Sequence, residues 1–418
     1  MSIPTTNRRV LISGASIAGP ALAYCLEAYG FTPTIVERSP SWRAGGYKID
    51  VRGAAVDVLK QMGIYEQVRQ ASVEMVGASF VNKAGESLAE MPADFIGMRQ
   101  GEDVELMRGD LSKVLYELTV PTCEYLFDES IRTIRESDSG VEVHFERSGP
   151  RYFDLVVGAD GIHSNVRSLV FGPEANFVQN LGDYYFALFS IPNYLGLDRR
   201  ELFYCVPGKV VNIYSTKGSP DAKALLLFKQ PGFTYDYRDV PNQKRLVADL
   251  FAGLGWQVPA LLEWMKRSTD FYFDTVEQIK MTSWSKGRTV LVGDAAYAPS
   301  LASGQGSSMA LVGAYILAGE LAKADGEFSS AFLNYERQLR GYVEMNQKLG
   351  ENVHQMVPAS RLGYWLQLRL ISLMNYLPLK GLILKKISQQ VRESAQAITF
   401  DPYVDHHNNR RPHPSMKP

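Results

Sequence analysis

Residues 289–306 read TVLVGDAAYAPSLASGQG, a strand-to-helix turn that carries a carboxylate. The continuous apolar run at its start predicts a strand buried on both faces. Glycines allow a backbone to approach a flat ring system closely, and a helix N-terminus stabilises nearby negative charge. The stretch therefore predicts one anchoring point for a large ligand. Its candidate binding residues are Gly293, Asp294, Pro299, Gly304, Gln305 and Gly306.

A second glycine-rich turn lies near the N-terminus. An apolar strand at 9–13 leads into it, a helix is predicted from Pro20 to Tyr29, and a further strand ends at Glu37. The turn follows a GxGxxG pattern with serine at the second glycine. Its backbone N–H groups and helix dipole are suited to a pyrophosphate. Its candidate binding residues are Gly14, Ser16, Ile17, Ala18 and Gly19.

Glu37 defines the kind of nucleotide that this turn accepts. A carboxylate at the end of the second strand can accept both hydroxyls of a ribose, and it would repel a 2′-phosphate. Glu37 and Arg38 therefore favour FAD or NAD over NADP at this position. Two distant turns indicate a ligand held at both ends. FAD, with adenosine at one end and ribityl-flavin at the other, is the predicted cofactor, with Asp294 accepting ribityl hydroxyls.

A third turn, Asp160-Gly161, follows the apolar strand 153–158 and precedes His163 and Arg167. A carboxylate delivered by a buried strand can bind a cofactor, but the same pattern forms ordinary Asx-turns. Both interpretations stay open from the residues alone. His163 by itself is more typical of a hydrogen-bonded structural histidine than of a catalyst.

Composition excludes several classes of function. The chain has 418 residues with 44 Lys and Arg against 45 Asp and Glu, a net charge of −1, so nothing favours nucleic acid or an anionic membrane. The three cysteines form no CxxC pair and the six histidines no ligand cluster, so neither a disulfide framework nor a metal site is predicted. The N-terminus has no signal-peptide pattern, and we expect a cytoplasmic monomer.

The order of strand and helix signals predicts an α/β fold. Residues 1–74, 108–172 and 281–345 should form a discontinuous, Rossmann-like FAD-binding domain in three layers (ββα). Residues 75–107 and 173–280 show short alternating runs, which predict an inserted antiparallel β-sheet substrate domain. Residues 346–400 should form a C-terminal helical segment, and 401–418 a disordered tail.

Leu362 to Ile387 is long and apolar. Charges and Pro378 interrupt it, so it predicts no integral membrane segment. A surface-packed amphipathic helix, broken near Pro378, is the favoured interpretation. Contact with a membrane interface is the alternative.

Taken together, the three turns resemble those of the single-component (group A) FAD-dependent aromatic monooxygenases. Gly14–Gly19 resembles their dinucleotide finger, Asp160-Gly161 their DG motif and Gly293-Asp294 their GD motif. Further likenesses are Gly45-Gly46 with Asp50 to Gly53, and Arg108 to Leu111. They imply that Gly46 lies beside the flavin, that Arg52 lies near the cofactor or NAD(P)H, and that Arg108 bonds the ribityl or phosphate region.

Within that class the chain is most similar to the tetracycline destructases. The likeness is carried by residues 191–197, 270–274, 278–281, 283–284 and 312–321, most of which are scaffold or flavin-side segments. The chain departs from that pattern at Ser16, at Ser308 and in the C-terminal helix.

The resemblance implies an enzyme that uses NADPH or NADH and O₂ to hydroxylate a polycyclic or phenolic small molecule through a flavin C4a-hydroperoxide. A tetracycline-type antibiotic is one implied substrate. The alternatives are a hydroxylase of a small aromatic acid or secondary metabolite, a non-oxygenating FAD reductase, and a plain NAD dehydrogenase or nucleotide-binding module. No catalytic side chain is assigned, because the cofactor carries the difficult chemistry.

Overall fold

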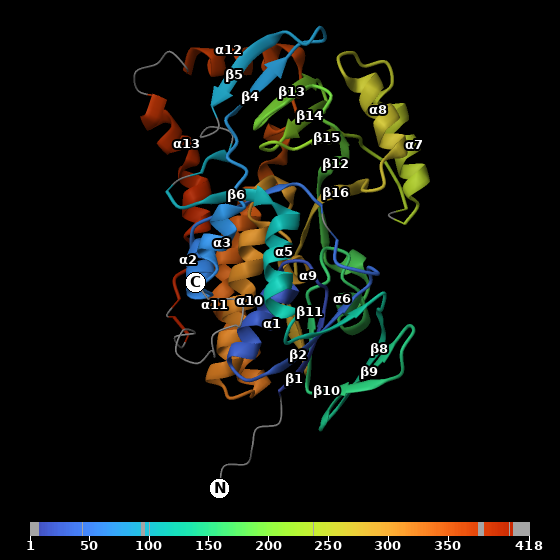
Figure 1. The fold of residues 1–418 in the computed structure, drawn as a ribbon, viewed down its shortest axis with the longest axis vertical. Helices are drawn as coiled ribbons and strands as arrows, with labels where there is room; N and C mark the ends of the chain where they lie inside the picture. Colours follow the sequence, from blue (N-terminus) through green and yellow to red (C-terminus); the bar gives the residue numbers. More distant parts are fainter. Residues whose placement is uncertain are drawn as a thin grey trace.

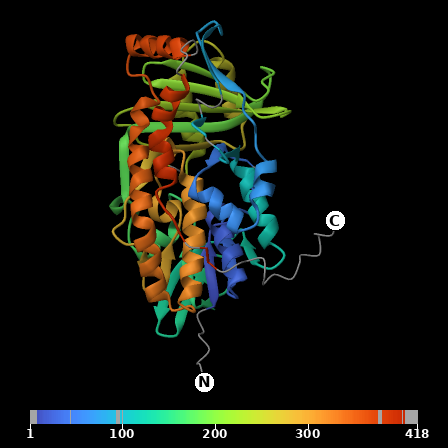
Figure 2. The same ribbon diagram turned by 90° about the vertical axis from the view of Figure 1, so that its left-hand side faces the viewer.

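The computed structural model describes residues 8–43, 45–92, 97–99, 101–236, 238–374, 380–400 and 402–403. Two large sheets dominate these residues, one parallel and one almost wholly antiparallel (Figure 1). In the view of Figure 2, the antiparallel sheet lies above the parallel one, and long helices run along both. The mixed α/β architecture predicted from the sequence is confirmed.

The parallel sheet has six strands in the order β17-β18-β11-β1-β2-β7. Only the β17–β18 pair is antiparallel. Its strands are continuously apolar because layers cover both faces: four of the five residues of β1 are buried. The strands are β1 (Arg9–Ser13), β2 (Thr32–Glu37), β7 (Glu124–Phe127), β11 (Leu155–Gly158), β17 (Ser285–Lys286) and β18 (Thr289–Leu291).

Helices cover one face of this sheet and a small three-stranded sheet covers the other, which gives the predicted ββα layers (Figure 1). Helix α10 is apolar on all sides because α1, α2 and α11 pack around it. The helices are α1 (Ala18–Ala28), α2 (Ala54–Gln61), α3 (Tyr65–Gln70), α5 (Arg108–Thr119), α6 (Asn165–Val170), α9 (Asp294–Tyr297), α10 (Gly306–Lys323) and α11 (Phe328–Gly350). The small sheet is β8 (Ile131–Ser137), β9 (Gly140–Phe145) and β10 (Arg151–Phe153).

The antiparallel sheet has seven strands in the order β16-β12-β15-β14-β13-β4-β5, with only β13 and β4 parallel. Helices α7 (Val240–Phe251) and α8 (Val258–Arg267) pack against one face. The other face contacts Leu301 and Ala302 of the parallel-sheet domain. The strands are β4 (Gly77–Val81), β5 (Ser87–Pro92), β12 (Val178–Pro192), β13 (Arg200–Val206), β14 (Lys209–Ser215), β15 (Asp221–Lys229) and β16 (Tyr272–Ile279).

Short elements connect the two domains. A two-stranded ribbon of β3 (Lys48–Val51) and β6 (Val104–Met107) lies between the sheets, where Lys48 pairs with Glu105 and with Glu201 of β13. Three short 3₁₀ turns complete the connections: η1 (Glu174–Asn176), η2 (Leu301–Ser303) and η3 (Glu351–Gln355).

The C-terminal segment forms α12 (Arg361–Met374) and α13 (Lys380–Ala395). The expected break at Pro378 lies outside the described residues. Helix α12 packs on β5 and exposes several large apolar side chains. No helix among the described residues is both long and apolar enough to cross a membrane. Of the predicted tail only 402–403 are described, and Tyr403 is buried, with its hydroxyl donating to Glu320 Oε1 at 2.7 Å.

Candidate active site

The N-terminal glycine turn lies at the carboxyl end of β1, beside Glu37 at the end of β2. Gly14 has φ of +111°, and a Cβ there would press against the carbonyl of Ala159. A Cβ on Gly19 would overlap the carbonyl oxygen of Gly14. Both positions therefore require glycine. Because no side chain caps the start of α1, its first N–H groups are available to an anion.

Glu37 is joined to this turn by hydrogen bonds. Its carboxylate accepts from the Ala15 amide at 3.0 Å and from the Ser39 amide at 2.8 Å. Arg38 is exposed just beyond it, and Arg43 lies 3.9 Å from the Glu37 carboxylate. The carboxylate is thus held at the edge of the turn, where a ribose would meet it.

Arg108 begins α5 and reaches back to the same turn. Its Nη2 donates to Ser16 Oγ at 2.6 Å. Its side chain packs so closely over Gly46 that a Cβ there would lie 3.2 Å from the Arg108 Cβ. The serine that interrupts the glycine pattern therefore has a structural partner, since it orients the arginine expected to bond the cofactor.

Asp160 faces protein groups. It accepts from Ser164 Oγ, from the Val166 amide at 3.0 Å and from Ser13 Oγ at 3.3 Å. Burial raises the pKa of Asp160 despite these hydrogen bonds. The Asp160 carboxylate is thus held by the start of α6 and by the end of β1. Gly161 follows with φ of +83°.

Polar atoms without partners gather at the start of α10. Gln305 is fully buried, and both atoms of its amide lack a hydrogen-bond partner. Arg52 is 6% exposed; its Nη2 donates to Asp50 and to Gly97, but its Nε has no partner. Its backbone amide donates to Ser308 Oγ at 3.2 Å. Buried polar atoms are seldom left unsatisfied. A flavin edge, which carries both carbonyls and an N–H, fits this donor and acceptor set.

The glycine-rich turn at residues 293–306 adjoins these atoms. Gly293 ends the strand segment and lies against Ala18 of α1, which brings the two turns together. The Pro299 carbonyl accepts from Gln278 Nε2 at 3.0 Å, and Ser300 has the unusual φ of +80°. Gly304 has a left-handed backbone conformation, and Gly306 lies beside the Asp294 carboxylate. Such backbone strain is typical of functional loops.

Asp294 borders open space, because its side chain is exposed at the start of α9. Burial raises the pKa of Asp294, and Arg108 lowers it. Tyr47 interacts electrostatically with Arg108, Asp294 and Asp274. Tyr272 interacts with Asp274, Tyr47 and Arg108. Tyr47, Arg108, Tyr272 and Asp294 thus lie near enough to one another for their charges to interact, although they come from segments of both domains.

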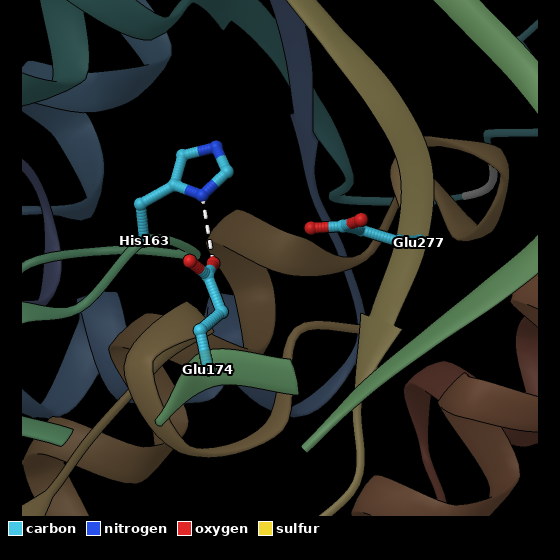
Figure 3. Close-up of side chains that lie close together, drawn as sticks. All are labelled: His163, Glu174 and Glu277. Carbon is cyan, nitrogen blue, oxygen red and sulfur yellow. Dashed lines mark hydrogen bonds and ion pairs between the residues drawn. The ribbon is translucent and has the colours of Figure 1, made fainter. Parts of the chain in front are cut away.

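The side chains of His163, Glu174 and Glu277 lie close together (Figure 3). His163 Nδ1 bonds Glu174 Oε1 at 2.8 Å, and Nε2 bonds Asp274 Oδ2 at 3.1 Å. Burial alone would lower the pKa of His163, but Asp274 and Glu174 raise it to about 10. Ligand atoms of His163, Glu174 and Glu277 lie within 4.8 Å of one another, a metal-like grouping. Both ring nitrogens of His163 donate to carboxylates, so the ring is a protonated imidazolium. This cation balances the carboxylates, as a metal ion would in a metal site.

The structure therefore brings together most residues predicted for the site. Sequence reasoning missed Tyr47, Tyr272 and Asp274. The one available signal was a carboxylate within the aromatic run 271–274 (FYFD), where an apolar residue was expected at Asp274. Tyr47, in the loop before β3, carried no signal.

Comparison with known proteins agrees with this geometry. Residues 7–340 match the family model described as the FAD binding domain. A flavin-dependent monooxygenase from an unknown prokaryotic organism is 45% identical over 344 residues, 82% of this chain and 89% of that protein.

Two crystal structures are similar over nearly the whole chain. The tetracycline destructase Tet(55) is 38% identical with a TM-score of 0.80, covering 95% of this chain and 99% of its own. Tet(51) is 36% identical with a TM-score of 0.82, covering 94% and 99%. These findings confirm the resemblance seen in the sequence, and the chain belongs to the FAD-binding domain family as an FAD-dependent monooxygenase.

Proposed function

We propose that this enzyme uses NADPH or NADH and O₂ to hydroxylate a polycyclic or phenolic small molecule, and that tetracyclines are the first candidates. The open space beside the exposed side chains of Asp294 and Tyr272, together with the match to the FAD binding domain model, carries the proposal. This space adjoins the predicted cofactor residues and the inner face of the antiparallel sheet. That face is apolar and aromatic, as a flat substrate requires. Its buried members include Tyr184, Phe186, Val210, Leu227 and Val276.

Each part of the site has a task in this proposal. The turn Gly14–Gly19 would hold the pyrophosphate and Glu37 the adenosine ribose. Arg108 and Asp294 would hold the ribityl chain, and the start of α10, with Gln305, would face the flavin edge. FAD, when bound, supplies the electron transfer from the nicotinamide and the activation of O₂. The protein positions the substrate, excludes water and supplies fixed charges.

The oxygenation test uses the purified protein under air. A panel of tetracyclines and simple phenols is offered with NADPH and, separately, with NADH. We expect one compound to stimulate nicotinamide oxidation and to gain one oxygen atom. Nicotinamide oxidation with a product that gains hydrogen but no oxygen would instead support the reductase alternative. A colourless protein without a flavin spectrum would contradict both.

The cofactor residues are tested by Asp294→Ala. Loss of this carboxylate should leave the purified protein with much less FAD than the unaltered enzyme. Asp249→Ala is the matched control, because Asp249 is exposed on α7 in an open ion pair with Arg245. Full flavin content in Asp294→Ala would contradict the assignment of Asp294 to the ribityl chain.

We further propose that the enzyme works as a cytoplasmic monomer. In the described structure Cys25, Cys123 and Cys205 form no disulfide, as expected in a reducing compartment. A size-exclusion mass of one chain, measured with light scattering, is the expected result; a stable dimer would contradict it.

A further inference from the structure

Tyr272 occupies a position where a substrate can be recognised. It begins β16 on the sheet face that looks toward the FAD-binding domain, since Val276 on that face packs with Leu301 and Ala302. The intervening Phe273 packs on the opposite face, under α7 and α8. Tyr272 is 43% exposed, and its ring centroid lies 5.7 Å from that of Phe186 on the same face. Its ring therefore borders open space on the side of the FAD-binding domain.

The hydroxyl of Tyr272 donates its one hydrogen to another residue of the protein. It donates to Asp274 Oδ2 at 2.6 Å, and Asp274 is 2% exposed. Asp274 also accepts from His163, from the Tyr235 hydroxyl at 3.0 Å and from the Thr275 amide at 2.9 Å. Burial would raise the pKa of Asp274, but His163 and these other donors lower it. Asp274 is thus a stable anion.

His163 keeps this carboxylate in place. Its second nitrogen bonds Glu174 (Figure 3), so the imidazolium is held between the Glu174 and Asp274 carboxylates. The ring cannot rotate without breaking a charge-assisted hydrogen bond. The direction of the Tyr272 hydroxyl is therefore determined by a buried array that the substrate does not touch.

A phenol has one hydrogen to donate and two lone pairs to accept with. Because its hydrogen points to Asp274, the exposed Tyr272 has lone pairs left to accept with. We propose that Tyr272 accepts a hydrogen bond from a phenol or enol hydroxyl of the substrate, with Asp274 and His163 as positioning residues. This subsite selects a hydroxyl donor over a carbonyl or carboxylate at that point of the substrate. The proposal rests on the proposed function and adds a chemical requirement to it.

The test compares Tyr272→Phe with Tyr235→Phe. Each variant removes one hydroxyl that donates to Asp274. Tyr235, however, packs edge-on against Phe273, on the sheet face under α7 and α8. The probe is tetracycline or, if tetracycline is not consumed, the phenol that the substrate panel identifies. Its dissociation constant is measured with the oxidised enzyme from the change in flavin absorbance. The measurement is repeated with ethers in which one hydroxyl at a time is methylated.

We expect Tyr272→Phe to weaken binding of the parent compound about three- to tenfold, the range for one net hydrogen bond. Methylating one particular hydroxyl should weaken binding to the unaltered enzyme and to Tyr235→Phe by at least as much. In Tyr272→Phe the same methylation should change binding less than about twofold. Both variants should melt at similar temperatures, because each removes one donor from Asp274.

Equal binding of the parent compound by Tyr272→Phe and the unaltered enzyme would overturn the subsite. So would a methylation penalty that is the same in both. If no panel compound stimulates nicotinamide oxidation by the unaltered enzyme, the proposed function itself has failed. These two failures are distinguishable because the second is measured without any variant.

Discussion

Replacing His163 with glutamine removes the one cation between Glu174 and Asp274, and the consequence should depend on pH in a defined way. The pKa of His163 rises from 6.5 to about 10 in the folded protein, and its side chain is 23% exposed. A raised pKa contributes stability that is fully present below about pH 6.5 and is lost as the pH rises through about 10. The charged and titratable groups around it are Glu174, Asp274, Glu277, Arg167, Tyr235 and Tyr272.

The size of the effect follows from the same values. At about 1.36 kcal/mol for each unit of pKa, the His163 interaction contributes on the order of 4 kcal/mol at pH 7 and close to zero at pH 10.5. The contacts with His163 also lower the pKa values of Glu174 and Asp274. Because these shifts arise from the same contacts, they add nothing further to the stability contribution of about 4 kcal/mol.

The assay is urea unfolding of the FAD-loaded enzyme and of His163→Gln, followed by circular dichroism at several pH values between 7 and 10.5. Other titrating groups cancel in the difference between the two proteins. The unaltered enzyme should be more stable by several kcal/mol at pH 7, and this advantage should shrink steadily as the pH rises. An advantage that stays constant over this range would refute an imidazolium held between carboxylates.

Three other substitutions probe the cofactor turn and the contact between domains. Gly19→Ala should yield protein with little FAD and a lower melting temperature, whereas Gly341→Ala, where a Cβ meets nothing within 4 Å, should keep its flavin and change stability by no more than about 1 kcal/mol. Ser16→Ala removes the acceptor of Arg108 and should weaken FAD binding by about fivefold, measured by fluorescence titration; unchanged affinity would show that Arg108 is oriented in another way. Lys48→Met removes the cation of the buried Glu201 carboxylate, whereas Glu105 keeps its ion pair with Arg99, and should cost about 3 kcal/mol in urea unfolding; a loss under about 1 kcal/mol would contradict this pairing.

Much of the fold could be predicted because local signals and burial agree. The run at 9–13 is apolar almost throughout since both faces of β1 are covered, and a strand with one solvated face would alternate polar and apolar residues instead. Gly14 and Gly19 are required by backbone contacts within one short turn. Glu37 is placed by the same β-α-β unit, so its position beside the turn was also predictable.

The residues on the substrate side of the site were harder to predict, because their positions depend on contacts between distant segments. Nothing near Tyr47 indicates that its loop faces β16, and Tyr272 reads as one more aromatic residue in an aromatic strand. Asp274 is separated by more than a hundred residues from His163, so their pairing follows from tertiary packing alone. The burial of Tyr403 was equally hard to predict, because a single aromatic side chain packed beside α10 leaves no periodic pattern in the sequence.

The central claim, that this chain is an oxygenase which adds an oxygen atom from O₂ to an organic substrate, is tested most directly with isotopically labelled gas. The FAD-loaded enzyme would be incubated with NADPH, the stimulating compound and ¹⁸O₂, and the product mass measured. One labelled oxygen atom in the product is the predicted result. Nicotinamide oxidation with unlabelled product, or with a product that has gained no oxygen, would contradict the account.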